Sequence, residues 1–175
     1  MRIPSSRNPA IASSLNPLVA SSLNPNVASS LNPNVASSKN PAVASSLNPR
    51  VASSINPRVA SSLNFMVASS INPAVSSRLN PAVSSSINPN IASNIDGLYV
   101  FTLQLNPVGF TVNANDRVTL LFNPDCAFRG VLVHVRPDFR NEFDLSNEWV
   151  GFWIHARDNV WLRFNLSNEW IGFTT

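Results

Sequence analysis

Apolar and polar positions repeat with a period of eight over the first half of the chain. Asparagine recurs from Asn8 to Asn88 without interruption, and the unit reads N-P-x-[VI]-[AS]-S-x-[LI]. The fourth position is Val or Ile in every copy and the sixth is always Ser, whereas the third is apolar, polar or basic. A disordered linker has no use for a fixed apolar register, so we expect an ordered repeat. Its representative structural positions are Asn24, Ser29, Asn48 and Ser53.

Two local structures fit this octad. In the first, V-A-S-S-L is a β-strand and N-P-x is a turn, so that positions four, six and eight face the same side. In the second, Asn is a helix N-cap, Pro is the first helical residue, and the apolar pair lies on a short helix. The residue before a proline disfavours the α region, and Ser-Ser beside a β-branched residue is poor helix material. The strand is therefore favoured.

A single eight-residue strand cannot bury its apolar side alone, and stacking of successive copies has to do so. We therefore predict that residues 1–95 form a stalk, either a one-chain β-solenoid or a three-chain β-spiral. The repeat resembles the octad-repeat β-stalks of viral, phage or spore fibres. This resemblance implies a homo-oligomer, as a trimer or a filament.

A second and longer period occupies residues 96–175. Each unit has a Phe followed eight positions later by a Gly, and the last two copies, FDLSNEWVGF and FNLSNEWIGF, are nearly identical. Alternating apolar residues on both sides of a polar turn predict one β-hairpin per unit. Four hairpins should close around a pseudo-four-fold axis, because closure removes exposed sheet edges. The glycines that mark this 21-residue period are Gly109, Gly130, Gly151 and Gly172.

The four units of the form Y-x-F-x-L…V-G-F resemble the four-fold β-flower domain, a small bacterial all-β module. The resemblance covers about residues 97–175 and implies a shape, since the family brings no catalytic residues. The second unit departs from the pattern at Pro124, Arg129 and Val131. The predicted fold class is thus all-β, with an octad-repeat β-solenoid or β-spiral stalk and a pseudo-four-fold β-hairpin head.

Charge divides the chain at the same place. Residues 1–95 hold six basic residues and no acidic one, whereas residues 96–175 hold six Arg against nine acidic residues. Such asymmetry favours two different modules. The cations of the first half are isolated and accompanied by one aromatic, Phe65, which does not predict nucleic-acid binding. With no secretory h-region and no apolar run of membrane length, we expect cytosolic synthesis and a place on a released particle such as a spore or virion.

Several residues with reactive side chains recur with the repeat. His134 and His155 occupy equivalent positions of successive units, as do Glu148 and Glu169, and Cys126 falls in a turn where the later units carry Asn. Repetition of one residue type does not produce the differentiated acid and base that catalysis needs. We therefore predict no catalytic, metal or cofactor site and no enzyme activity.

The candidate ligand contacts are the four tryptophans, Trp149, Trp153, Trp161 and Trp170. With Val150 and Ile171 expected to face inward, the neighbouring tryptophans should face outward beside strand glycines. Packing of an aromatic over a glycine is one interpretation, and a platform for glycan or a surface protein is the other.

The predicted function is that of a non-enzymatic structural or attachment protein, fibre-like, with a stalk that self-assembles and a head that caps it or contacts a partner. The alternative is a glycan- or protein-binding module that uses the tryptophans of the head. Glycan arrays and imaging of the particle distinguish the two.

Overall fold

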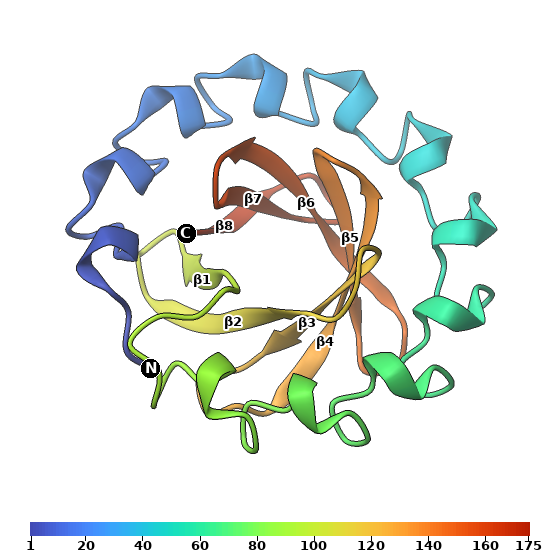
Figure 1. Ribbon diagram of the computed structural model, residues 1–175. Helices are drawn as coiled ribbons and strands as arrows, with labels where there is room; N and C mark the ends of the chain where they lie inside the picture. Colours follow the sequence, from blue (N-terminus) through green and yellow to red (C-terminus); the bar gives the residue numbers. More distant parts are fainter.

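The computed structural model describes all residues from 1 to 175, and it consists of a β-barrel enclosed by a belt (Figure 1). The belt, residues 1–95, carries eleven short 3-10 helices, and the barrel is built from the eight strands that follow. The helices are η1 (Ser5–Arg7), η2 (Ser13–Leu15), η3 (Ser21–Leu23), η4 (Ser29–Leu31), η5 (Ser37–Lys39), η6 (Ser45–Leu47), η7 (Ser53–Ile55), η8 (Ser61–Leu63), η9 (Ser69–Ile71), η10 (Ser77–Leu79) and η11 (Ser85–Ile87). The strands are β1 (Tyr99–Thr102), β2 (Pro107–Asn113), β3 (Val118–Phe122), β4 (Phe128–Arg136), β5 (Phe139–Asp144), β6 (Trp149–Arg157), β7 (Val160–Asn165) and β8 (Trp170–Thr174).

The barrel confirms the all-β prediction. Its strands follow chain order, each pairs antiparallel with the next, and β1 pairs with β8 to close the sheet. Each 21-residue unit supplies two strands joined by a short turn, so the repeat in the sequence is a repeat of hairpins. Closure leaves the sheet without a free edge.

The glycines of the 21-residue period stand where neighbouring strands approach most closely. A Cβ at Gly151 would lie 2.5 Å from the carbonyl oxygen of Phe164, and one at Gly172 would lie 2.5 Å from that of Phe101. Gly151 also lies beside an irregularity in strand register, opposite the step from Glu142 to Phe143. Only glycine permits this approach at each hairpin junction.

The predicted β-strands of the octads do not form. In the octad that begins at Asn24, the Asn side chain accepts a hydrogen bond from the N–H of Asn26 at 2.9 Å. Its carbonyl accepts from the N–H groups of Val27 and Ala28 at 3.0 and 2.7 Å. Most backbone N–H groups thus bond within the octad or to the carbonyl of the neighbouring turn, and no ladder to another octad forms. The N-cap alternative describes this first turn correctly.

The Ser-Ser-Leu segment adds a second turn, because each octad then continues into a 3-10 helix. The carbonyl of Ser29 accepts from the N–H of Asn32 at 3.1 Å, while the Ser29 side chain is exposed. The same holds for Ser53, whose carbonyl accepts from Asn56 at 3.1 Å. The fixed serines therefore begin 3-10 turns, and the prediction that position six faces the same side as position eight is wrong.

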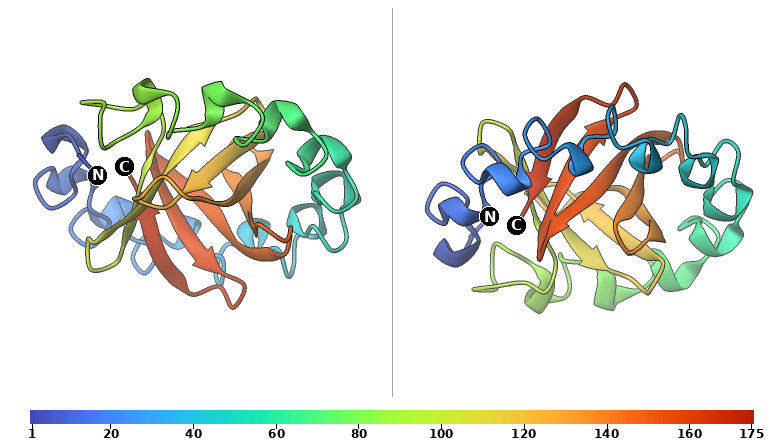
Figure 2. Two further views of the ribbon diagram at one scale, coloured as in Figure 1. Left: turned by 90° about the horizontal axis from the view of Figure 1, so that it is seen from below. Right: turned by 90° about the horizontal axis from the view of Figure 1, so that it is seen from above.

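The octads also do not form a separate stalk. Leu and Ile at position eight point at the barrel, and Leu23, Leu47 and Leu63 are at most 1% exposed. These residues share one apolar core with the outward-facing phenylalanines of the strands. Views from below and above show the belt running around the barrel (Figure 2). An apolar outer barrel surface requires such a cover, which explains why the two repeats occur together.

Arg7 closes the belt into a ring. Its guanidinium donates to the carbonyl oxygens of Ile95, Gly97 and Thr175 at 2.9, 2.7 and 2.5 Å. It also lies 4.7 Å from the centre of the Tyr99 ring. The start of the belt, its end and the C-terminus are thereby joined by one side chain. None of the helices has the length and apolar character needed to cross a membrane.

Candidate functional site

The tryptophans do not form one outward platform. Trp153 is fully buried and Trp161 is 6% exposed, both inside the barrel, whereas Trp149 and Trp170 are half-buried beneath the belt. Val150, expected to face inward, is 39% exposed, and Ile171 is 36% exposed.

The physical reason for this error is the irregularity in register beside Gly151. It shifts the alternation along β6, so that Trp149 and Phe152 both pack in the core beneath the belt and Val150 is left at the surface. The same irregularity recurs where β7 pairs with β8. The prediction assumed that buried and exposed residues alternate without interruption past the glycine. It therefore placed Val150 and Ile171 in the interior, whereas they lie at the surface.

The inside of the barrel holds a buried polar group beside an apolar cluster that includes Trp153 and Trp161. Glu142 accepts from Arg163 through both carboxylate oxygens, at 2.7 and 2.8 Å, and from the indole N–H of Trp153 at 2.7 Å. Burial alone would raise the pKa of Glu142, but the hydrogen bonds and charge of Arg163 outweigh it, and the pKa lies below its ordinary value. This bidentate pair holds strands β5, β6 and β7 together. Sequence reasoning missed it, although Glu142 and Arg163 are one 21-residue period apart.

A second polar group lies at one end of the barrel. His134 is bonded to Thr119 Oγ1 at 2.8 Å and to the carbonyl of Asp116 at 2.9 Å. Burial, followed by the nearby charge of Arg140, lowers the pKa of His134 to about 4. Arg140 lies 4.0 Å from the centre of the Trp161 ring, and burial lowers its pKa to about 10. The imidazole is therefore neutral and structural.

The other repeated candidates also have structural roles. His155 is bonded to the carbonyl of Asp158 at 2.9 Å and packs on Trp161. Glu148 pairs with Arg58 of the belt, and Glu169 accepts from Asn165 at 2.6 Å. No three His, Cys, Asp or Glu side chains gather where they would hold a metal ion.

Belt and barrel are in register, with three octads for each hairpin unit. Arg136 donates to the carbonyl of Ser38 at 3.0 Å, and Arg157, its equivalent in the next unit, donates to that of Ser14 at 2.8 Å. One unit forward along the barrel thus corresponds to three octads back along the belt. The two layers run in opposite directions around the molecule (Figure 1).

This register creates equivalent grooves between belt and barrel. The charged groove lies at the third unit, where Arg58 pairs with Glu148 and Arg50 lies 5.4 Å from the centre of the Trp149 ring. At the equivalent place of the fourth unit, the Asn34 and Asn168 side chains are joined by a hydrogen bond of 3.2 Å. Asn34 stands three octads before Arg58, as the register requires.

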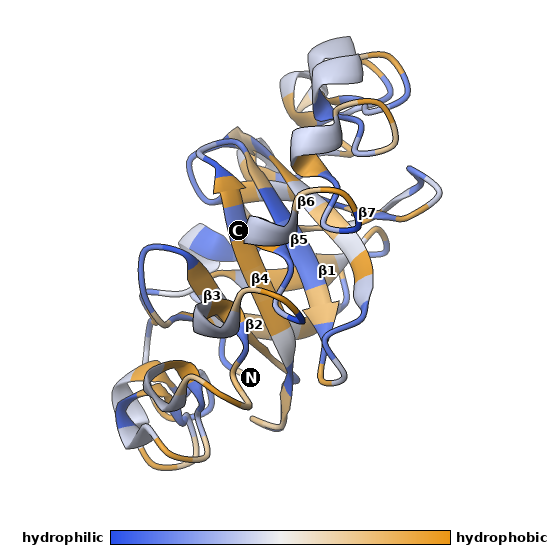
Figure 3. Cartoon of the chain, turned by 90° about the vertical axis from the view of Figure 1, so that its right-hand side faces the viewer, coloured by the Kyte–Doolittle hydropathy of each residue, from blue (hydrophilic) through white to orange (hydrophobic).

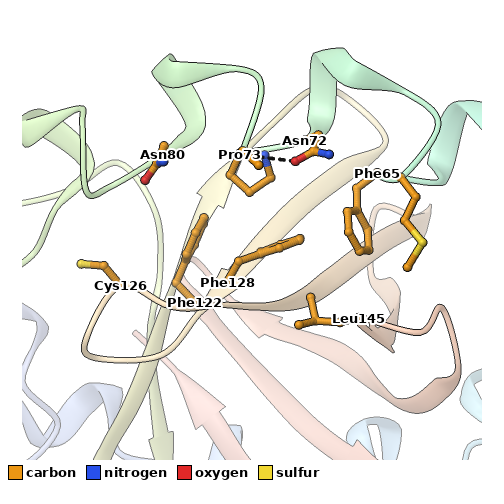
Figure 4. A pocket seen from close by; sticks show the side chains of 10 residues that line it. Phe65, Asn72, Pro73, Asn80, Phe122, Cys126, Phe128 and Leu145 are labelled. Atoms are coloured by element: carbon orange, nitrogen blue, oxygen red, sulfur yellow. Dashed lines mark hydrogen bonds between the residues drawn. The ribbon is translucent and has the colours of Figure 1, made fainter.

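The groove of the second unit is apolar and open (Figure 4). This apolar groove has a volume of about 490 Å³, against about 130 Å³ for the charged groove. Ala74 and Ala82 occupy the belt positions equivalent to Arg50 and Arg58, and Ala127 occupies that of Glu148. Its lining is Phe65, Met66, Asn72, Pro73, Ala74, Asn80, Phe122, Cys126, Phe128 and Leu145.

Aromatic rings form the wall of the apolar groove. Phe128 stands where the later units carry Trp149 and Trp170, and Phe65 stands where every other octad carries Pro. The two rings meet edge to face, with centroids 4.9 Å apart, and Phe122 lies 5.5 Å from Phe128. Phe65, an exception to the octad pattern, therefore contacts Phe128, an exception to the hairpin pattern. The sequence alone could not predict this contact, because it does not show which octad lies beside which hairpin unit.

Cys126 closes one side of this groove. Its backbone is left-handed, with φ 70°, as are Leu105, Asn147 and Asn168 at the equivalent turns. Burial raises the pKa of its thiol, which therefore stays protonated at neutral pH. The sulfur also accepts a weak hydrogen bond from Asn90 Nδ2 of the belt, at 3.8 Å.

The outer edge of the belt carries a second feature, the valine rim. It consists of the Val or Ile at position four of every octad, and these side chains are 61–67% exposed. Figure 3 shows apolar segments, in orange, recurring on the outer loops of the belt. The members are Ile11, Val19, Val27, Val35, Val43, Val51, Val59, Val67, Val75, Val83 and Ile91.

Comparisons with known proteins do not assign this arrangement. A scan against protein-family models and searches of curated proteins and of solved structures find no match to the chain. The resemblance to the four-fold β-flower domain consequently rests on the 21-residue repeat alone.

Proposed function

We propose that this protein is a non-enzymatic structural and attachment protein that self-assembles through its valine rim. The observation that carries the proposal is the contrast between two exposed positions of the same octad. Position three varies freely between Ala, Asn, Arg, Leu and Met, whereas position four, equally exposed, is always Val or Ile.

Nothing within the chain accounts for the fixed side chain at position four. The backbone N–H at position four donates to the carbonyl of the preceding Asn, as from Val43 to Asn40 at 3.0 Å. Any residue other than proline would make this hydrogen bond. A repeated apolar side chain that is unburied in its own fold indicates burial in an assembly.

A second copy of the chain is the occupant that fits best. An identical rim has the same spacing between its valines, so two rims match in period without further adjustment. The serines at positions six and seven are also exposed and supply hydrogen-bonding groups beside the valines. The association is therefore expected to be homotypic.

Sedimentation velocity over a range of concentrations tests this proposal. A variant with four Val→Thr changes keeps the β-branched shape while adding a hydroxyl, and a control carries Ala→Thr at exposed position three. We expect the wild type and the control to associate, and the fourfold variant, which keeps seven of the eleven rim residues, to associate more weakly. A wild type that stays monomeric up to millimolar concentration, or a fourfold variant that associates equally, contradicts the proposal. The changed residues are Val35, Val43, Val51 and Val59, with Ala42 and Ala82 as controls.

A further inference from the structure

We infer that the apolar groove of the second unit is a binding site for an uncharged, flat aromatic small molecule. This inference is independent of the valine rim, since the groove lies between belt and barrel and the rim lies on the outer edge of the belt. A volume of about 490 Å³ is in the range of small-molecule sites.

Comparison with the charged groove shows that the apolar groove lacks the side chains that fill the equivalent space in the third unit. The same six positions line both grooves, but the long side chain of Arg50 is replaced by Ala74, and Trp149 by the smaller Phe128. The ion pair between Arg58 and Glu148 is also absent, because both equivalents are alanine. The large side chains that fill the groove of the third unit are therefore absent from the second, which leaves space for a ligand.

The chemistry of the lining selects the ligand. Phe65, Phe122 and Phe128 present ring edges and faces at different angles, which suits offset or edge-to-face contact with another aromatic ring. No charged side chain lines the groove, so an ionic ligand would lose its hydration without gaining a partner. The Oδ1 atoms of Asn72 and Asn80 already accept from backbone N–H groups, so their Nδ2 groups remain to donate to a carbonyl or hydroxyl oxygen of the ligand.

Met66 and Leu145 extend the apolar lining to the solvent. They are 59% and 42% exposed, and both line the groove. Both would be covered by a molecule seated in the groove. Removal of their apolar surface from water favours binding.

Binding of Nile red, a neutral planar dye, tests the inference on the full chain. Ala74→Arg restores the side chain of the charged groove at an exposed position where other octads already carry Arg, so the fold is expected to persist. Ala42→Arg is the matched control, since it makes the same change in an octad away from the groove. We expect the wild type and Ala42→Arg to bind with similar affinity, and Ala74→Arg to bind at least about tenfold more weakly.

The thiol of Cys126 provides a second readout. Because it is the only cysteine and lines the groove, its alkylation by iodoacetamide should slow when Nile red is bound. No fluorescence enhancement with the wild type, equal binding by the two Arg variants, or an unchanged alkylation rate would each overturn the inference. Binding abolished by the fourfold Val→Thr variant, and not by Ala74→Arg, would assign the dye to the rim and equally overturn it.

Discussion

Truncation of two apolar residues in one octad distinguishes a belt from a stalk. Leu47 is fully buried against the barrel, whereas Val43 is 65% exposed. Leu47→Ala removes three carbons, worth about 2.4 kcal/mol at ~0.8 kcal/mol each. The cavity left behind raises the loss to about 3–4 kcal/mol. Val43→Ala should change the free energy of unfolding of the monomer by less than about 0.5 kcal/mol.

Urea denaturation followed by tryptophan fluorescence measures both variants, at a protein concentration too low for assembly. Trp153 lies in the barrel and Leu47 in the belt, so a single transition shifted by Leu47→Ala shows that the two layers unfold together. In a β-stalk, positions four and eight face the same buried side, and the two substitutions would cost similar amounts. Equal losses, or a barrel transition that Leu47→Ala leaves unchanged, would refute the belt.

Three further predictions concern single positions in the barrel. Cys126→Asn should stabilise the protein by up to about 1 kcal/mol in thermal unfolding, because Asn tolerates the left-handed backbone better than Cys. Glu142→Gln should cost about 3–5 kcal/mol in urea, since it leaves the buried Arg163 without its carboxylate. The lowered pKa of Glu142 also means that its contribution is complete above about pH 4.5 and is lost on further acidification, a loss that Glu142→Gln should not show. The pKa of His134, lowered from 6.5 to about 4, predicts a contribution that is complete above pH 6.5 and lost as pH falls through about 4, with a matching resonance shift in an NMR titration.

The barrel could be predicted from the sequence because its signals are local. Alternation on two sides of a turn defines each hairpin, and the 21-residue spacing of glycines fixes the number of units. Which side of each strand is buried is not a local property. Phe152 and Trp153 are both fully buried, one beneath the belt and one inside the barrel. In a sheet with cover on both faces, alternation no longer tells the inside from the outside.

The prediction for the octads was wrong for a different reason. Their pattern fitted a strand and a capped turn, and the strand was favoured because Ser-Ser-Leu is poor helix material and the residue before proline avoids the α region. Asn24 does avoid the α region, with φ −88° and ψ 115°, but that conformation is also the one an N-cap adopts. Turns of three residues need little helix propensity, because leucine packing against the barrel stabilises them.

The register also gives the first hairpin unit a special position. Three octads for each of four units would require twelve octads, and the chain has eleven. The missing octad falls at the first unit, where Arg7 closes the ring and the chain passes from belt to barrel. That unit carries Leu105 and Pro107 where the third and fourth carry Asn and Trp, so it lacks both residues that face a groove. The first unit is therefore the place where the two layers are joined by one chain.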